Sequence, residues 1–186
     1  MILSDARYRE IWNESVMEAI TQELNMDTTL KLVSDFHNAF EIAQPDGIDI
    51  NPPRMVITEL VELAAMLKTV ADRAHKAAEY YNGDGYLLRV QLMAEELAEV
   101  VEAMADKDVV GTLHELADLR VVCDGTALCL GLGGYLVPAV QEIMRANMSK
   151  LDDNGKPIKN AAGRVVKGPN FKKADVSVVL QKCNQF

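Results

Sequence analysis

Residues 57–81 repeat apolar side chains in alternating steps of three and four residues, which is the spacing of one face of an α-helix. The repeated positions are Ile57, Leu60, Ala64, Leu67, Ala71, Ala74, Ala78 and Tyr81. A seam this regular packs along a second helix, because a lone helix would leave it in water. The segment Asn82-Gly83-Asp84-Gly85 then interrupts the pattern. The seam therefore predicts a long helix inside a helical assembly.

The rest of the chain agrees with an all-α fold. Aromatic residues make up only 5% of the chain, fewer than a β-sandwich favours. Capping residues, helical spacing and Gly or Pro breaks predict further helices at about residues 4–25, 28–42, 86–105, 109–130 and 135–150. Residues 152–170 predict a hairpin or ordered loop, followed by a loosely held end. We expect a helix bundle of about five to six helices with a short C-terminal loop or hairpin tail.

Charge and cysteine content argue against several classes of protein. The formal net charge of −9 leaves no excess positive charge for generic binding to nucleic acid. The three cysteines form no C-x-x-C pair, which argues against a zinc finger or a disulfide framework and fits a reducing cytoplasm. No signal-peptide pattern begins the chain, and Asp118, Arg120 and Asp124 interrupt the most apolar stretch, residues 116–136. We expect a cytoplasmic protein without a membrane span.

Acidic side chains gather in the fourth and fifth predicted helices. In the fourth, Glu96 and Glu99 lie one helical turn apart, directly after Glu95. In the fifth, Glu115 and Asp118 have the same spacing. The short connection makes the two helices antiparallel neighbours, so we expect two pairs of carboxylates to face each other at the edge of the apolar stripes.

Four like charges at the edge of a core raise one another's pKa strongly unless a cation binds between them. Oxygen ligands without His or Cys suit Mg²⁺, with Mn²⁺ as a substitute, and Mg²⁺ favours phosphate oxygens. The cluster therefore predicts phosphoryl chemistry on a polyphosphate. A di-iron centre is disfavoured because no His follows Glu99 or Glu115 by three residues. The alternative is that these acids are solvated helix-face charges of a non-enzymatic helical interaction protein.

The acidic pattern resembles a known signature. Glu95-Glu96-x-x-Glu99 followed by Glu115-x-x-Asp118 is similar to the E-E-x-x-E…E-x-x-D motif of the all-α nucleoside triphosphate pyrophosphohydrolases, which include MazG-type, phosphoribosyl-ATP pyrophosphohydrolase-like and dimeric dUTPase-like proteins. Further segments resemble the MazG-like branch: F-H-x-A-F at 36–40, G-T-A at 125–127, N-M-S-K-L at 147–151 and K-G-P-N-F at 167–171. The resemblance covers about residues 33–55 and 86–175.

The resemblance implies Mg²⁺-dependent hydrolysis of a canonical or modified (deoxy)nucleoside triphosphate to a monophosphate and pyrophosphate, in control of the nucleotide pool. It also implies a homodimer or homotetramer. The implied metal ligands are Glu96, Glu99, Glu115 and Asp118, and Glu95 is the implied base or orienter of the attacking water. Asn147 and Lys150 would approach phosphate or metal, and Lys167 would belong to a lid over the polyphosphate. A phosphoribosyl-ATP pyrophosphohydrolase of histidine synthesis is an alternative, against which the two closing segments argue.

The resemblance also divides the chain. Residues 1–30 form an N-terminal helical extension, residues 31–151 the MazG-like domain with an inserted helix at about 56–85, and residues 152–186 a tail that could cover the active site. In the insert, Glu59 and Glu62 copy half of the acidic motif and are interpreted as solvated surface. Asp124 departs from the apolar face of its helix. It is interpreted either as a satisfied buried or interface acid, or as a substrate-binding acid that hydrogen-bonds the sugar or base.

Overall fold

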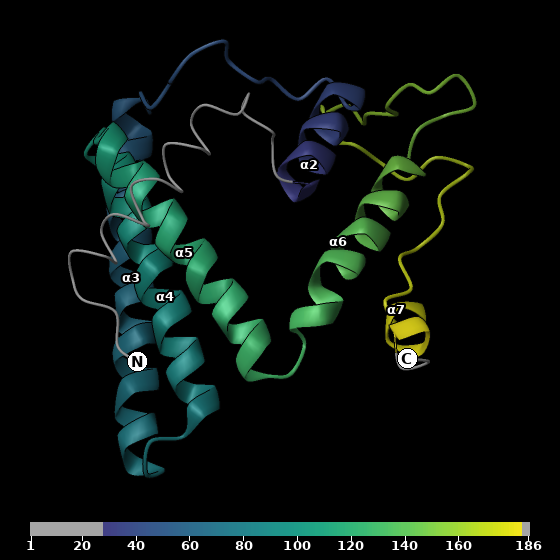
Figure 1. Ribbon diagram of the computed structural model, residues 1–186. Helices are drawn as coiled ribbons and strands as arrows, with labels where there is room; N and C mark the ends of the chain where they lie inside the picture. The colour runs from purple at the N-terminus through teal and green to yellow at the C-terminus, as the bar shows by residue number, and fades with distance from the viewer. Residues whose placement is uncertain (1–27, 184–186) are drawn as a thin grey trace, which may run out of the picture. The chain divides into compact units, whose positions relative to one another are not determined.

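The computed structural model describes residues 28–183, which contain six helices (Figure 1). They are α2 (Thr28–Ala39), α3 (Arg54–Tyr80), α4 (Gly85–Ala105), α5 (Val109–Cys129), α6 (Gly133–Met148) and α7 (Ser177–Cys183). The described residues form no strands, only two isolated antiparallel bridges, and the predicted all-α helical bundle is confirmed. The helix predicted at residues 4–25 lies outside the described residues.

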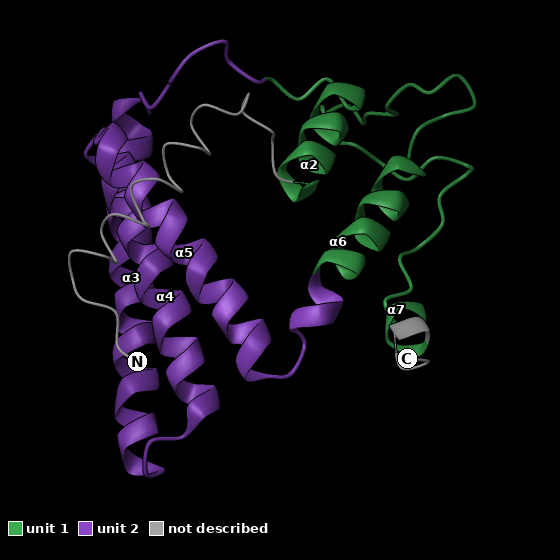
Figure 2. Cartoon of the chain, viewed as in Figure 1, with its two compact units in different colours: residues 1–43, 137–186 green, residues 44–136 purple. Residues whose placement is uncertain are grey.

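The chain divides into two compact units (Figure 2). Unit 2 spans residues 44–136 and contains α3, α4 and α5. Unit 1 combines residues 1–43 with residues 137–186, and its described part contains α2, most of α6 and α7.

In unit 2, α4 packs against both α3 and α5 (Figure 1). The predicted seam of α3 is buried at its alanines, Ala64, Ala71, Ala74 and Ala78, which let the two helices approach closely. The side chains that α3 and α5 contact on α4 differ: α3 reaches Gln91 and Glu102, whereas Gly125 of α5 lies beside Arg89.

Local capping explains where these helices begin and end. Asp84 begins α4 because its carboxylate accepts hydrogen bonds from the backbone N–H groups of Tyr86 and Leu87, both at 3.0 Å. Asp108 begins α5 in the same way through the N–H of Gly111 at 3.0 Å. The end of α3 turns at Gly83, whose φ of +80° is a conformation that glycine adopts without strain.

The apolar faces of α4 and α5 are only partly buried among the described residues. On α4, Val100 is buried, but Leu97 is 39% exposed and Met104 is 37% exposed. On α5, Leu113 and Leu128 are 71% and 70% exposed. Helical periodicity identifies an apolar face but not what covers it, and among the described residues these faces of unit 2 stay open to solvent.

Unit 1 is built around Phe40, which is fully buried and stacks beside Phe36 with ring centroids 4.5 Å apart. The tail after α6 contains the two bridges, Leu151 with Pro157 and Lys159 with Val165, in agreement with the predicted hairpin or ordered loop. The end of the described chain is not loose: it forms α7, in which Val179 is buried.

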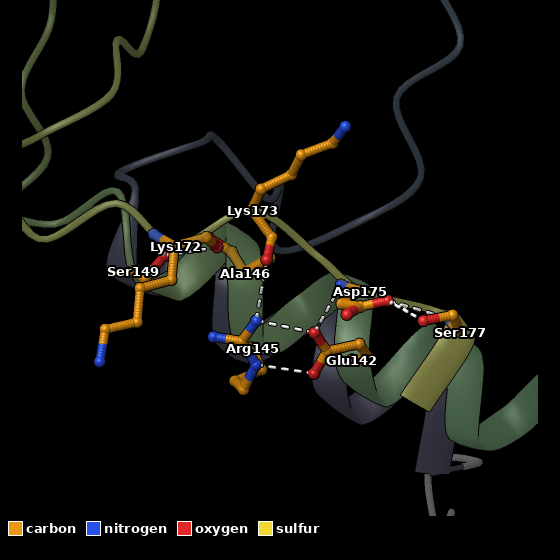
Figure 3. A network of polar contacts seen from close by, with 8 residues as sticks. All are labelled: Glu142, Arg145, Ala146, Ser149, Lys172, Lys173, Asp175 and Ser177. Atoms are coloured by element: carbon orange, nitrogen blue, oxygen red, sulfur yellow. Dashed lines mark hydrogen bonds and ion pairs between the residues drawn. The ribbon is translucent and has the colours of Figure 1, made fainter. Parts of the chain in front are cut away.

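A polar network ties this tail to α6 (Figure 3). Glu142 accepts two hydrogen bonds of 2.7 Å from the guanidinium of Arg145 and a third of 2.9 Å from the backbone N–H of Asp175. Asp175 in turn accepts hydrogen bonds from the backbone N–H and hydroxyl of Ser177 at the start of α7. The contact between Glu142 and Asp175, which are 33 residues apart in the chain, therefore helps to hold the start of α7. The spacing of apolar residues did not predict this short helix.

No single helix among residues 28–183 combines the length and apolar character needed to cross a membrane, although α5 and α6 together, as a bent pair, reach that composition.

Candidate metal centre

The contact between α4 and α5 brings the predicted carboxylates together. Oxygen atoms of Glu96, Glu99 and Glu115 can lie within 4.8 Å of one another, and so can ligand atoms of His114, Glu115 and Asp118. The two groups share Glu115. Of the four predicted ligands, Glu96, Glu99 and Glu115 therefore come together in one group, whereas Asp118 groups with Glu115 and His114. Their role as metal ligands stays a prediction.

Partial burial and mutual repulsion raise the pKa of two carboxylates in this cluster. Partial burial, followed by the charges of Asp118, Glu115 and Glu95, raises the pKa of Glu96. Partial burial also raises the pKa of Glu99, to which the charge of Glu115 and a side-chain hydrogen bond with it contribute. Both carboxylates thus hold protons more strongly than usual, and a bound cation would relieve the repulsion.

Glu95 lies beside the cluster and has a defined orientation. Its Oε1 accepts a hydrogen bond of 3.0 Å from Nε2 of Gln91, one turn earlier on α4. The Oε1 of Gln91 accepts in turn from Nδ1 of His75 on α3, at 3.2 Å. Gln91 could have been found from its i, i+4 spacing with Glu95, but His75 could not, because its position depends on how α3 packs.

Two cationic or ionisable side chains border the acids, and sequence reasoning gave neither a role in the site. The ammonium of Lys68 on α3 lies 2.6 Å from Glu102. Its charge lowers the pKa of Glu99, whereas the charges of the neighbouring carboxylates raise it. The second side chain is His114 on α5. It is exposed, and its Nε2 lies 3.1 Å from Oδ2 of Asp118.

The predicted phosphate-binding residues belong to unit 1. Nζ of Lys150 donates a hydrogen bond of 2.8 Å to Oδ1 of Asn147, and the ammonium of Lys167 lies 4.7 Å from the ring centroid of Phe171. The two closing segments touch at Gly168, where an added Cβ would lie 2.9 Å from the carbonyl oxygen of Lys150. The two motifs therefore form one substructure, and the roles of these residues stay predictions.

Asp124 is exposed on α5 and pairs with Arg120 one turn earlier, at 3.7 Å between Oδ2 and Nε. It is not a buried acid within the described chain. Its part in binding a sugar or base stays a prediction.

Comparison with known proteins gives one line of support. A family model described as phosphoribosyl-ATP pyrophosphohydrolase matches residues 60–147, which include all of α4 and α5 and therefore all five acids of the motif. The match agrees with the resemblance inferred from the motifs and supports pyrophosphohydrolase activity in general. It also includes α3 from residue 60 onward, so the interpretation of that helix as an insert stays a prediction. No curated protein and no solved structure gives a match.

Proposed function

We propose that this protein cleaves a (deoxy)nucleoside triphosphate between its α- and β-phosphates, since residues 60–147 match the phosphoribosyl-ATP pyrophosphohydrolase family model. The products would be a nucleoside monophosphate and pyrophosphate, and the role would be control of the nucleotide pool. One observation supports the proposal above all: carboxylates from two neighbouring helices lie close together, and partial burial together with their mutual repulsion raises the pKa of two of them.

The donor set fits a hard divalent cation. Glu96, Glu99, Glu115 and Asp118 offer carboxylate oxygens only, which suits Mg²⁺, with Mn²⁺ as a substitute. These four residues would hold the ion. When bound, such an ion neutralises phosphate charge and lowers the pKa of a coordinated water.

Glu95 is the residue we assign to the attacking water. Its Oε1 is occupied by the hydrogen bond from Gln91, whereas its Oε2 receives none from the described residues. Oε2 is therefore the atom that would take the proton of the water as the oxygen attacks phosphorus. Gln91, itself oriented by His75, keeps the carboxylate from rotating away, which makes it a positioning residue.

The remaining assignments concern the substrate. Asn147 and Lys150 would contact the phosphates or the metal, and Lys167 would contribute to a lid. The amide of Asn147 and the ammonium of Lys150 are already joined to each other by a hydrogen bond, so they would act as one unit. Asp124 would hydrogen-bond the sugar or base after release from Arg120.

A second copy of the chain would cover the open apolar faces of unit 2. Large apolar side chains that stay exposed on two adjacent helices are typical of an association surface. Leu97, Met104, Leu113 and Leu128 are the side chains that support this proposal. The assembly would be a homodimer or a homotetramer.

One observation favours a second candidate. The matching family model is described as phosphoribosyl-ATP pyrophosphohydrolase, so this nucleotide belongs among the substrates to be tested. The segments N-M-S-K-L and K-G-P-N-F favour the MazG-like alternative, and apart from its first residue, Asn147, the pair lies outside the matched residues.

The test is a screen for pyrophosphate release from all ribo- and deoxynucleoside triphosphates and from phosphoribosyl-ATP, with Mg²⁺ and with Mn²⁺. Glu96→Gln and Glu115→Gln should abolish release and weaken Mg²⁺ binding in calorimetry. Glu59→Gln is the matched control, because Glu59 is an exposed acid of the same kind on α3. Release from phosphoribosyl-ATP alone would select the second candidate. No release from any substrate, together with no Mg²⁺ binding, would favour a non-enzymatic interaction protein.

A further inference from the structure

A cavity of about 320 Å³ lies in unit 2 where α4 begins and α5 ends. Its lining includes Tyr86, Leu88, Arg89, Cys129 and Leu130. Cavities of this size hold small molecules in proteins, and a mostly apolar wall with a few polar groups suits a flat ring with a polar edge. Asp84 and Arg89 are the charged residues of the lining, and Oδ1 of Asp84 already accepts hydrogen bonds from the backbone N–H groups of Tyr86 and Leu87. The cavity shares no residue with the carboxylate cluster.

Arg89 is the basic residue of α4, a helix that otherwise contains only acids among its charged side chains. It is half-buried, yet no hydrogen bond or ion pair joins its guanidinium to another residue in the described chain. A guanidinium has five N–H donors and accepts nothing, so a half-buried one without an acceptor is incompletely satisfied. The side chain is therefore suited to a ligand that presents acceptor atoms.

Gly125 on α5 lies opposite Arg89. A Cβ built on it would lie 3.7 Å from Nη1 of Arg89. Glycine inside a helix is destabilising relative to alanine, and Gly125 has no positive φ that would require it. An alanine would fit here at an ordinary contact distance, so the space beside the guanidinium excludes only larger side chains.

The cavity is within reach of a nucleotide held at the carboxylates. Arg89 precedes Glu96 by seven residues, which is two helical turns on nearly the same side of α4, or roughly 10 Å along the helix axis. Both side chains face α5, since Arg89 lies beside Gly125 and Glu96 feels the charges of Glu115 and Asp118. A nucleotide whose phosphates bind at the carboxylates can therefore extend along α4 and α5 toward Arg89.

We propose that this cavity binds the base of the nucleotide, with Arg89 donating hydrogen bonds to a carbonyl oxygen on the base edge and Tyr86 supplying an aromatic face. This inference rests on the proposed function. Guanine, cytosine, uracil and thymine all present a carbonyl oxygen. Adenine has no carbonyl oxygen: it offers a guanidinium only ring nitrogens as acceptors, and its amino group is a donor that a guanidinium cannot pair with. Adenine nucleotides are therefore the weakest ligands of this cavity.

Calorimetry on the full chain tests this with the four nucleoside 5′-monophosphates and with ribose 5-phosphate, which lacks a base, in the presence of Mg²⁺. Adenosine monophosphate should bind most weakly. Arg89→Met should weaken the other three by about tenfold, because hydrogen bonds to a charged group are lost, and should bring them to the level of adenosine monophosphate. Ribose 5-phosphate should bind Arg89→Met and the parent equally.

Matched variants separate this role from a structural one. Gly125→Leu should fill the space beside the guanidinium and weaken the same three ligands, whereas Gly125→Ala, at an ordinary contact distance, should not. Arg73→Met removes an exposed arginine of α3 and should have no effect. Circular dichroism and Mg²⁺ affinity should stay unchanged in all four variants.

The outcomes distinguish this inference from the proposed function. Pyrophosphate release that occurs with unchanged base preference in Arg89→Met would overturn the inference and leave the function standing. Arg89-dependent binding without pyrophosphate release from any triphosphate would overturn the proposed function and leave this inference standing. Equal weakening of ribose 5-phosphate would show that Arg89 contacts phosphate and would overturn the base assignment, as would tightest binding of adenosine monophosphate.

Discussion

Gln91 donates a hydrogen bond of 3.0 Å to Glu95 from the preceding turn of α4, and this bond occupies one of the two carboxylate oxygens. The other oxygen is left for the water in the proposed reaction. The amide has no charge of its own, so its contribution is to hold a carboxylate in position beside the cluster.

Gln91→Leu should lower kcat while leaving Mg²⁺ affinity nearly unchanged. A hydrogen bond to a charged group contributes about 1.5–3 kcal/mol, so the decrease in kcat is expected to be about tenfold or more. Steady-state pyrophosphate release and calorimetry measure the two quantities separately. His75→Gln should show a smaller decrease in kcat, because His75 contacts Gln91 and not Glu95. A changed Mg²⁺ affinity with unchanged kcat would contradict the positioning role.

Glu99→Gln should stabilise the protein in the presence of a metal chelator. The pKa of Glu99 is raised in the folded state above its usual 4.5, so the folded chain binds protons more tightly than the unfolded chain. The sign follows: this contribution to stability is fully present below about pH 4.5 and is lost as the pH rises through the raised pKa. Removing the charge should therefore help more at neutral pH than near pH 4.5.

Urea unfolding with chelator near pH 4.5 and near pH 7.5 measures this difference. Mg²⁺ should stabilise the parent more than Glu99→Gln, since binding to the folded state alone raises its free energy of unfolding. Glu59→Gln again serves as the control on an exposed acid. If Glu99→Gln were less stable than the parent at neutral pH without metal, the assignment of repulsion within the cluster would be wrong.

The geometry of the acid cluster could be predicted because it depends on local spacing. Glu96 and Glu99 share a helix, Glu115 and Asp118 share the next, and the short link from Asp106 to Asp108 makes the helices neighbours. Both the seam of α3 and the helix boundaries also follow from local pattern and capping.

What could not be predicted depends on contacts between distant segments. Lys68 approaches Glu102, and His75 approaches Gln91, only because α3 packs in one particular register along α4. The short helix α7 is held by Glu142, which is far away in sequence, so the local pattern indicated a loose end. Helical spacing likewise does not show that Leu97 stays 39% exposed among the described residues.

Gly168→Ala should destabilise the protein by about 1–3 kcal/mol, the usual cost of overpacking. The added Cβ would lie 2.9 Å from the carbonyl oxygen of Lys150 and 3.3 Å from that of Leu151, and backbone atoms cannot yield as a flexible side chain can. Thermal unfolding monitored by circular dichroism measures the effect. Gly134→Ala is the control, because nothing lies within 4 Å of its added Cβ. Equal unfolding midpoints for both variants would contradict the close approach of the two closing segments.

Glu142→Gln should loosen the tail at residues 172–177. The carboxylate of Glu142 holds both Arg145 and the backbone N–H of Asp175, and the amide replacement keeps one acceptor but loses the charge (Figure 3). Limited proteolysis should therefore cleave after Lys172 or Lys173 faster in the variant than in the parent. Glu79→Gln, at an exposed acid of α3, should leave the rate unchanged. Unchanged cleavage in Glu142→Gln would mean that the tail is held by its other contacts.

Leu113→Asp should convert the proposed oligomer into a monomer. Leu113 is 71% exposed on α5, and a charge at this position would have to be buried without a partner if a second copy covered the face. Size-exclusion chromatography with light scattering gives the mass directly. Leu128→Asp should act in the same way, while Ile48→Asp, at an exposed apolar residue of the loop before α3, should leave the mass unchanged. A monomeric parent chain at all concentrations would refute the association, and because the carboxylate cluster lies within one copy, Mg²⁺ binding would then be expected to persist in the monomer.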